Sequence, residues 1–257
     1  PPALNSATDS TAISTGINMK IGILAAGTTP DELTDRYDSY AQMFINLFGK
    51  AGAEFEYAVF DVRDDIFPQS AAECDGWIIS GSKFNVYQKL PWMLKLEALI
   101  RDINDLGKPL IGICFGHQII AEALGGKVDK YEGGWGVGLH TYRLTGDAAE
   151  LTDMPEFTIN AMHQDQVIVK PESARVFAES DFCQYAGLLY GDNIMTFQAH
   201  PEFTIPFEQD LVAARKGSVV PDDVAEAGLE TVHAEGAATD SVAVGKWMAA
   251  FLNKAAQ

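Results

Sequence analysis

The chain has 257 residues, of which 47% are hydrophobic and 21% are charged, a balance typical of globular proteins and not of disordered or fibrous ones. Its 36 acidic and 18 basic side chains give a net charge of −18, which argues against nucleic acid as a partner because a phosphate backbone would be repelled. No apolar run approaches the ~20 residues of a membrane span, so we expect no membrane partner.

The N-terminal residues 1–18 are rich in Ser, Thr and Ala and contain no Lys or Arg, so we expect a disordered tail or an upstream segment and not a targeting peptide. Residues 19–257 fit one folded domain. Three cysteines, Cys74, Cys114 and Cys183, are too few and of the wrong parity for a disulfide framework, which favours a cytoplasmic location.

From residue 20 onward, strand-like and helix-like patterns alternate as in βαβ units. Strands are expected at residues 20–25, 54–60, 76–79 and 110–113. One expected helix carries Tyr40, Phe44 and Leu47 on one face, and two others span residues 91–107 and 115–124. We therefore expect an α/β fold, a three-layer sandwich with a central mostly parallel sheet.

After Gly126 the pattern changes to short strands separated by turns, which indicates antiparallel or mixed pairing and a small antiparallel subsheet. These strands are expected at residues 128–131, 138–144, 157–159, 166–169 and 175–178, followed by a hairpin of 185–190 with 194–197. Asp240 is expected to N-cap a closing helix over 241–253. Residues 204–239 show no legible pattern.

A Gly-x-Cys-x-Gly pattern centred on Cys114 follows an apolar strand and precedes a helix. Glycines two residues either side allow a sharp turn that projects the thiol above the sheet edge, as in the serine nucleophile elbow. Backbone N–H groups at the helix start can stabilise a thiolate and an oxyanion. Taken alone, the pattern fits a buried Cys in a tight turn equally well.

A base for this nucleophile is available at His200, 86 residues downstream and after another apolar strand. In an extended segment, residues i and i+2 share a face, so Glu202 can hold the ring of His200. A lone His-x-Glu is more often a solvated strand end, but with the elbow the two residues predict a Cys-His-Glu triad. The Cys and His residues are scattered and show no spacing typical of metal ligands, so the sequence predicts no metal site. It also contains no glycine-rich phosphate loop, so we expect no cofactor.

The elbow Gly-x-Cys-x-Gly-x-Gln at 112–118 and the distant His-Pro-Glu at 200–202 together resemble the signature of the class I glutamine amidotransferase family. The resemblance spans about residues 19–204, and it implies a glutaminase-type fold and a cysteine amidohydrolase. Within the family the chain is most similar to the stand-alone GMP-synthase-like branch, which includes plant γ-glutamyl peptidases. Supporting similarity lies at residues 37–40, 81–87 and 91–92.

The resemblance also implies roles for individual residues. Cys114 would attack a γ-carboxamide to form a γ-glutamyl thioester, His200 would protonate the leaving amine and then activate water, and Glu202 would orient His200. The backbone amides of Gly81 and Phe115 would form the oxyanion hole. The residues implied in substrate binding are Gln118, His163, Gln164, Asp165 and Trp135, although a plain turn explains His163 and Asp165 about as well.

Gly136 stands where relatives often carry an acidic residue, in the loop over the substrate. This difference from the relatives has two interpretations. Either the glutamyl α-amino group is recognised in another way, or there is more room over the site for a larger substrate. Cys74 and Cys183 are expected to be packing thiols, and His140 and His233 to be solvated.

Three functions remain open. The first is a free-standing hydrolase of a γ-glutamyl amide, either glutamine or a γ-glutamyl peptide, with that small molecule as its partner. The second is a glutaminase subunit that delivers ammonia to a separate synthetase. We expect the glutaminase half to use all of the about 240 folded residues, so the synthetase would have to be another chain. The third is a non-catalytic regulatory or binding module on the same fold, which the intact Cys114, His200 and Glu202 argue against.

Overall fold

The computed structural model describes residues 18–257, so the expected tail lies outside the described residues apart from Asn18. Within this part of the chain a nine-stranded sheet has the order β2-β1-β3-β4-β11-β10-β9-β6-β7, and β5 pairs with β8 in a second, two-stranded sheet. The strands are β1 (Lys20–Leu24), β2 (Glu56–Phe60), β3 (Gly76–Ile79), β4 (Leu110–Ile113), β5 (Lys127–Lys130), β6 (Gly136–Leu144), β7 (Glu156–His163), β8 (Asp165–Val169), β9 (Ala174–Glu179), β10 (Gly187–Tyr190) and β11 (Ile194–Phe197).

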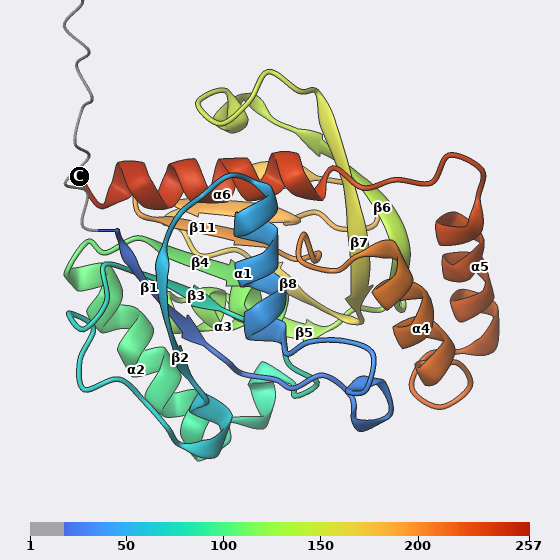
Figure 1. Ribbon diagram of the computed structural model, residues 1–257, viewed down its shortest axis with the longest axis horizontal. Helices are drawn as coiled ribbons and strands as arrows, with labels where there is room; N and C mark the ends of the chain where they lie inside the picture. The colour runs from blue at the N-terminus through green and yellow to red at the C-terminus, as the bar shows by residue number, and fades with distance from the viewer. Residues whose placement is uncertain (1–17) are drawn as a thin grey trace, which may run out of the picture.

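The helices are α1 (Tyr40–Lys50), α2 (Pro91–Asp105), α3 (Phe115–Ala123), α4 (Ile205–Arg215), α5 (Asp222–His233) and α6 (Ser241–Ala255), with short 3-10 turns at Asp31–Leu33, Val62–Asp64, Val86–Gln88 and Gly146–Ala148. Helices α1 and α6 cover one face of the large sheet and α2 and α3 the other (Figure 1). Each face has its own apolar core: Phe44, Phe48 and Trp247 on the first side, and Met93, Leu96 and Ile119 on the second. The three-layer α/β sandwich is therefore confirmed.

The sheet combines two kinds of pairing. Strands β2, β1, β3, β4 and β11 are parallel, with β4 between β3 and β11. From β11 onward the neighbours β10, β9, β6 and β7 pair antiparallel, and β10 and β11 form the expected hairpin. The carboxyl ends of β4 and β11 consequently lie side by side, which is where open α/β sheets bind ligands.

The segment without a legible sequence pattern forms α4 and α5. Thr204 caps α4 by accepting a hydrogen bond from the Phe207 N–H at 3.3 Å. Helix α5 packs on β6 so closely that a Cβ on Gly138 would lie 2.5 Å from the Gly228 carbonyl oxygen. None of the helices within residues 18–257 is long and apolar enough to cross a membrane.

The expected cap of α6 is wrong in its bonding partner. Asp240 does precede the helix, but its side chain makes no capping hydrogen bond. Its Oδ2 instead accepts from the Thr158 N–H at 2.8 Å, and its own N–H donates to the Thr158 carbonyl at 2.8 Å. Asp240 thus pairs with the backbone of Thr158 in the edge strand β7. Its side chain bonds this distant N–H and not an N–H of its own helix.

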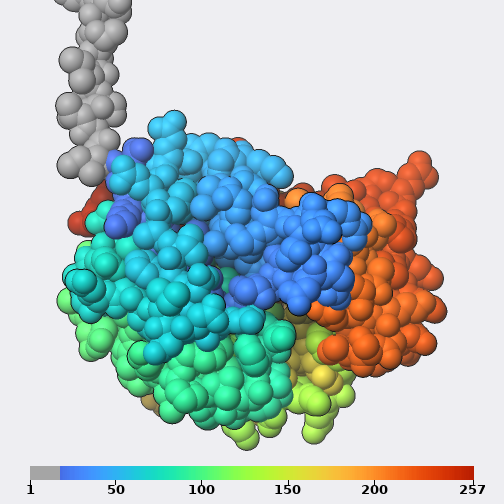
Figure 2. Space-filling model, turned by 60° about the horizontal axis from the view of Figure 1, so that its bottom comes forward, coloured from blue at the N-terminus to red at the C-terminus, as the bar shows by residue number. Residues whose placement is uncertain are grey.

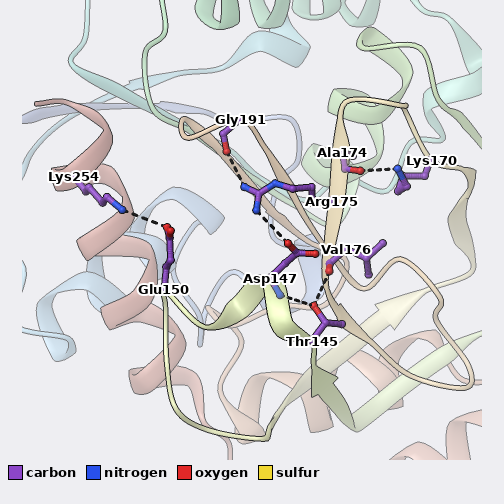
Figure 3. Close-up of polar contacts among 9 residues, drawn as sticks. All are labelled: Thr145, Asp147, Glu150, Lys170, Ala174, Arg175, Val176, Gly191 and Lys254. Carbon is purple, nitrogen blue, oxygen red and sulfur yellow. Dashed lines mark hydrogen bonds and ion pairs between the residues drawn. The ribbon is translucent and has the colours of Figure 1, made fainter.

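Several separate polar contacts join surface segments of the antiparallel half with one another and with the end of α6 (Figure 3). Arg175 on β9 pairs with Asp147 at 3.3 Å and donates to the Gly191 carbonyl at the hairpin turn at 3.1 Å. Lys254 near the end of α6 lies 3.4 Å from Glu150. These exposed ion pairs each contribute about 0–1 kcal/mol, so they add little to the stability of the fold.

Candidate active site

The turn between β4 and α3 carries Cys114 in a strained backbone conformation, with φ 54° and ψ −106°. A non-glycine residue at positive φ costs on the order of 1–3 kcal/mol and persists only when its surroundings enforce it. Here the Cys114 N–H donates to the Phe197 carbonyl at 2.8 Å, and the Cys114 carbonyl accepts from Gln118 at 3.0 Å. The turn has the strand, sharp bend and helix of a nucleophile elbow.

Both glycines of the elbow are required by close approach. A Cβ on Gly112 would lie 2.6 Å from Cδ1 of Ile120 and 2.7 Å from the backbone of Gly116. A Cβ on Gly116 would lie 2.4 Å from the Ile79 carbonyl oxygen on β3. The glycines therefore let α3 start directly above the sheet, which sets the position of the thiol.

His200 and Glu202 follow β11 and are brought together as expected. His200 Nδ1 lies 3.1 Å from Glu202 Oε2, with both side chains buried. Burial lowers the pKa of His200, but the charges of Glu202 and Cys114 outweigh burial and raise it well above the usual value. Because Nδ1 is bonded to Glu202, Nε2 is the ring nitrogen available to the Cys114 thiol.

The ring of His200 is fixed on one face by Phe203. The two rings are parallel within 2° and their centroids are 3.9 Å apart. The His200 N–H donates to the Asn160 carbonyl at 2.8 Å, which anchors the segment to β7. Sequence reasoning did not assign Phe203 to the site, and only its adjacency to Glu202 could have suggested it.

The backbone of Gly81 lies beside Cys114 and His200. A Cβ on Gly81 would come within 2.9 Å of His200 Cε1 and 3.8 Å of Cys114 Cβ. Within residues 18–257, the N–H groups of Gly81 and Phe115 have no hydrogen-bond acceptor. Two unpaired backbone donors beside a thiol could serve as an oxyanion hole.

A buried amide chain links the elbow helix to the thiol. Gln118 Nε2 donates to Gln198 Oε1 at 3.2 Å, and Gln198 Nε2 lies 3.6 Å from Cys114 Sγ. Gln198 was not predicted as a site residue. The signal was its place directly after β11 and two residues before His200, although the segment bends at Gln198 and turns at Glu202 and is not extended as expected.

A cavity of about 690 Å³ opens above Cys114, within the range of small-molecule sites. Five predicted substrate-binding residues line it together with Cys114, Gly81 and His200: Gln118, Trp135, His163, Gln164 and Asp165. The Asp165 carbonyl accepts from Gln118 Nε2 at 3.0 Å and contacts His163 Nδ1 at 3.2 Å. Gln118, His163 and Asp165 therefore lie together on one wall of the cavity.

The titratable groups of this wall are shifted by burial. Burial lowers the pKa of His163 to about 3, so the ring is neutral. Burial also raises the pKa of Asp165, although the Tyr87 hydroxyl donates to it at 3.0 Å. Tyr87 is a further neighbour of the site that sequence reasoning did not identify.

Gly136 does not enlarge the site, contrary to one of the two expectations. A Cβ there would lie 2.8 Å from Phe182 Cε1 and 3.3 Å from His163 Nε2, and Gly136 opens β6 without lining the cavity. The space is filled by Phe182, whose ring is also 5.6 Å from that of His140. His140 is accordingly half-buried and not solvated, and burial lowers its pKa.

The other two cysteines are buried packing residues, as expected. Cys74 belongs to one apolar core and Cys183 to the other. Burial raises the pKa of Cys74 to about 11 and that of Cys183 to about 12. Neither thiol ionises near neutral pH, so Cys114 alone combines a thiol with a histidine partner among the described residues.

Comparison with known proteins agrees with this geometry. The family model of class I glutamine amidotransferases matches residues 32–215. Gamma-glutamyl peptidase 2 of Arabidopsis thaliana is 29% identical over 213 residues, covering 79% of this chain and 85% of the relative. Gamma-glutamyl peptidase 5 of the same plant is 34% identical over 175 residues, covering 65% and 69%. A glutamine-hydrolyzing GMP synthase subunit of Halobacterium salinarum is 27% identical over 177 residues, covering 68% and 91%.

Solved structures share the fold. A glutamine amidotransferase from Thermotoga maritima superposes with a TM-score of 0.71 at 18% identity, covering 92% of this chain and 98% of that one. A glutamine amidotransferase from Methylobacillus flagellatus superposes with a TM-score of 0.69 at 21% identity, covering 93% of this chain and 95% of that one. With the family model matching well over half of the chain, this protein belongs to the class I glutamine amidotransferase family.

Proposed function

We propose that this chain hydrolyses the γ-glutamyl amide bond of γ-glutamyl peptides with Cys114 as nucleophile, His200 as acid and base, and Glu202 as the residue that orients His200. The observation that carries the proposal is the convergence of a strained Cys114, the buried pair of His200 and Glu202, and two unpaired backbone donors on one cavity. A chain that had lost its activity would gain nothing from the strain at Cys114.

In the first half of the reaction, the proton of the Cys114 thiol passes to His200 Nε2, whose raised pKa favours holding it, and the sulfur then attacks the γ-carbonyl carbon as a thiolate. The carbonyl oxygen becomes an oxyanion that the N–H groups of Gly81 and Phe115 stabilise. The tetrahedral intermediate then collapses. The C–N bond breaks, His200 gives its proton to the leaving amine, and a γ-glutamyl thioester remains on Cys114.

In the second half, a water molecule takes the place of the departed amine. His200 accepts a proton from the water, whose oxygen attacks the thioester carbon, and the same two N–H groups hold the second oxyanion. The C–S bond breaks, glutamate leaves, and His200 returns the proton to the Cys114 sulfur. Glu202 keeps the ring in one orientation and stabilises its charged form throughout.

Two features favour a peptide over glutamine as the substrate. Several relatives at about 30% identity bear the name gamma-glutamyl peptidase. The cavity also extends from Cys114 to side chains well beyond the wall of Gln118 and Asp165, reaching Thr28, Arg63 and Arg215. We further propose a cytoplasmic location, since Cys114 must stay a free thiol and no cysteine of residues 18–257 forms a disulfide.

The test is a set of specificity constants for the purified chain with glutamine, glutathione and a panel of γ-glutamyl dipeptides. We expect at least one γ-glutamyl peptide to exceed glutamine by more than about tenfold, and Cys114→Ser to abolish hydrolysis of all of them. Cys74→Ser is the matched control, because it removes a thiol from the core and not from the cavity.

A glutaminase component of a larger synthetase is the second candidate, supported by the relative that is named as part of a GMP synthase. Such a component would use the same residues but would release ammonia to a separate synthetase chain. Glutamine cleavage that starts only when a synthetase partner is added, with no peptide hydrolysed, would replace our proposal by this one.

A further inference from the structure

The cavity above Cys114 carries a positively charged wall that the hydrolysis of the amide bond does not use. Arg63 follows β2 and Lys83 follows β3, and both line the cavity. The Arg63 guanidinium lies 5.7 Å and the Lys83 ammonium 5.6 Å from the ring centre of Phe84. Two cations from different loops therefore converge on one aromatic ring. In Figure 2 the blue segment after β1, the teal segments that include these loops and the orange α4 region come together on one face.

These two cations differ from the other basic side chains of the cavity. Arg215 is neutralised by Glu32, whose carboxylate lies 2.7 Å away. Lys130 also has no ion pair among the described residues, but its charge acts on the wall of Gln118 and Asp165, where it lowers the pKa of Asp165 against the larger effect of burial. Within residues 18–257, neither Arg63 nor Lys83 has a carboxylate at ion-pair distance. Arg63 is half-buried and Lys83 is exposed, so both can meet a ligand that enters the cavity from solvent.

The Arg63 side chain is also held in place. Its Nη1 donates to the Thr28 hydroxyl at 3.1 Å, which holds the guanidinium against the loop that follows β1. Phe84 packs on Trp92 with ring centres 6.0 Å apart, so the ring beneath the two cations is anchored to α2. An oriented guanidinium with free N–H groups matches a carboxylate in shape and charge.

The position of this wall decides which carboxylate it can meet. In the proposed function the glutamyl end of the substrate lies against the wall of Gln118, His163 and Asp165, which are bonded to one another. Arg63 and Lys83 make no contact with that group and belong to the loops after β2 and β3. A substrate held by its glutamyl end and cleaved at Cys114 extends its other end toward the remaining walls of the cavity.

We propose that Arg63 and Lys83, supported by Phe84, form a subsite that binds the free carboxylate of the amino acid beyond the scissile γ-glutamyl bond. The inference rests on the proposed function and deepens it by naming the substrate class: γ-glutamyl peptides whose leaving residue ends in a carboxylate. Glutamine releases ammonia and offers nothing to this subsite. The same contact therefore favours peptides over glutamine.

The experiment compares γ-glutamylglycine with γ-glutamylglycinamide, which differ only in the carboxylate of the leaving residue. We expect wild type to hydrolyse the acid with a kcat/KM about fivefold above the amide, the size expected for partly exposed charge pairs. In the Arg63→Gln, Lys83→Gln double variant the ratio of the two kcat/KM values should fall to about one. The change should come from a lower kcat/KM for the acid, with the kcat/KM for the amide unchanged. High salt should reduce the wild-type ratio in the same direction.

A matched control is Lys95→Gln. Lys95 also lies over a phenylalanine, with its ammonium 4.8 Å from the Phe67 ring centre, but it pairs with Asp65 and does not line the cavity. This variant should keep the wild-type ratio. The second arm uses a γ-glutamylglycine whose glutamyl α-carboxylate is replaced by a carboxamide. Compared with unmodified γ-glutamylglycine, its rate should fall by the same factor in wild type and in the double variant.

A binding measurement separates the subsite from the reaction. With Cys114→Ala protein, calorimetry should show tighter binding of the acid than of the amide by about the same factor, and the double variant should abolish the difference. Equal affinities, or a double variant that responds to the glutamyl α-carboxylate, would overturn the subsite while leaving the proposed hydrolysis intact. Tighter binding of the acid without any turnover by wild type would support the subsite and reject the proposed function.

Discussion

His200 Nδ1 lies 3.1 Å from Glu202 Oε2, and the two side chains are 5% and 1% exposed. His200 forms an isolated β-bridge with Asn160 and Glu202 lies in the turn that follows, so the pair comes from one short segment and not from the extended segment that the sequence predicted. Phe203 covers one face of the imidazole, and the Glu202 Oε1 atom is buried without a hydrogen-bond partner in the described chain. The carboxylate is thus directed at His200 alone.

The pair predicts a pH effect. Burial lowers the pKa of His200, but Glu202 and Cys114 raise it well above the usual value, so the protonated ring persists to higher pH. A ring that must donate a proton to the leaving amine loses this ability as the pH rises through that pKa. Glu202→Gln removes the stabilising charge and lowers the pKa of His200. The alkaline limb of the kcat/KM profile should therefore move to lower pH, and an unmoved limb would mean that Glu202 does not act on the ring.

His200→Ala should abolish turnover, whereas Glu202→Gln should reduce it less, because losing the base removes proton transfer and losing the carboxylate only misplaces the ring. The two effects should not add in the double variant. Steady-state rates, with circular dichroism as the check on folding, measure this. Additive losses would indicate that the two residues act independently.

The thiols should differ sharply in reactivity. Burial raises the pKa of Cys74 to about 11 and that of Cys183 to about 12, so both stay protonated near neutral pH. A substoichiometric glutamine-like chloroketone should modify Cys114 first, as read by peptide mass mapping. Preferential labelling of Cys74 or Cys183 would remove the assignment of Cys114 as nucleophile.

The elbow glycines should be intolerant of a methyl group. Gly116→Ala places a Cβ 2.4 Å from the Ile79 carbonyl oxygen and should cost about 1–3 kcal/mol of unfolding free energy, with loss of activity. Gly49→Ala in α1 is the control, because its Cβ would meet nothing within 4 Å, and it should stabilise by about 0.4–1 kcal/mol. Urea unfolding compares the two, and equal effects would refute the packing argument.

Glu208 should make stability depend on pH. The residue is fully buried, its Oε2 accepts from the Gly138 N–H at 2.9 Å, and burial raises its pKa to about 8 from 4.5. Between these two values the folded state keeps a proton that the unfolded state releases. Stability should therefore fall as the pH rises from about 4.5 to 8, by at most about 1.4 kcal/mol per pH unit from this group. Glu208→Gln should flatten that part of the profile, and an unchanged slope would contradict the burial of a protonated carboxyl.

The sequence predicted the elbow because a strand, a turn with flanking glycines and a helix define the place of Cys114. It also predicted the contact of His200 with Glu202, but the reason given for it was wrong, because Glu202 lies in a turn and not in an extended segment. Gln198 lies two residues before His200 and was overlooked because an amide suggests no chemistry by itself. Roles transferred from the family resemblance to Gln118, His163 and Asp165 remain predictions, although the three residues do share a wall of the cavity.

What the sequence could not predict depends on contacts between distant segments. Helices α4 and α5 lacked a legible pattern because their buried faces are narrow and pack on β6 and on each other. The room expected at Gly136 is occupied by Phe182, 46 residues away in the chain. Asp240 likewise bonds the backbone of Thr158 in place of its own helix.

The most direct test of the central claim is to quench the enzyme with acid during turnover of a γ-glutamyl peptide and to map the mass of its peptides. We predict one added γ-glutamyl group, located on Cys114 and removed by mild base as expected for a thioester. Turnover that continues at full rate in Cys114→Ser protein, or a γ-glutamyl group found on any other residue, would contradict the account.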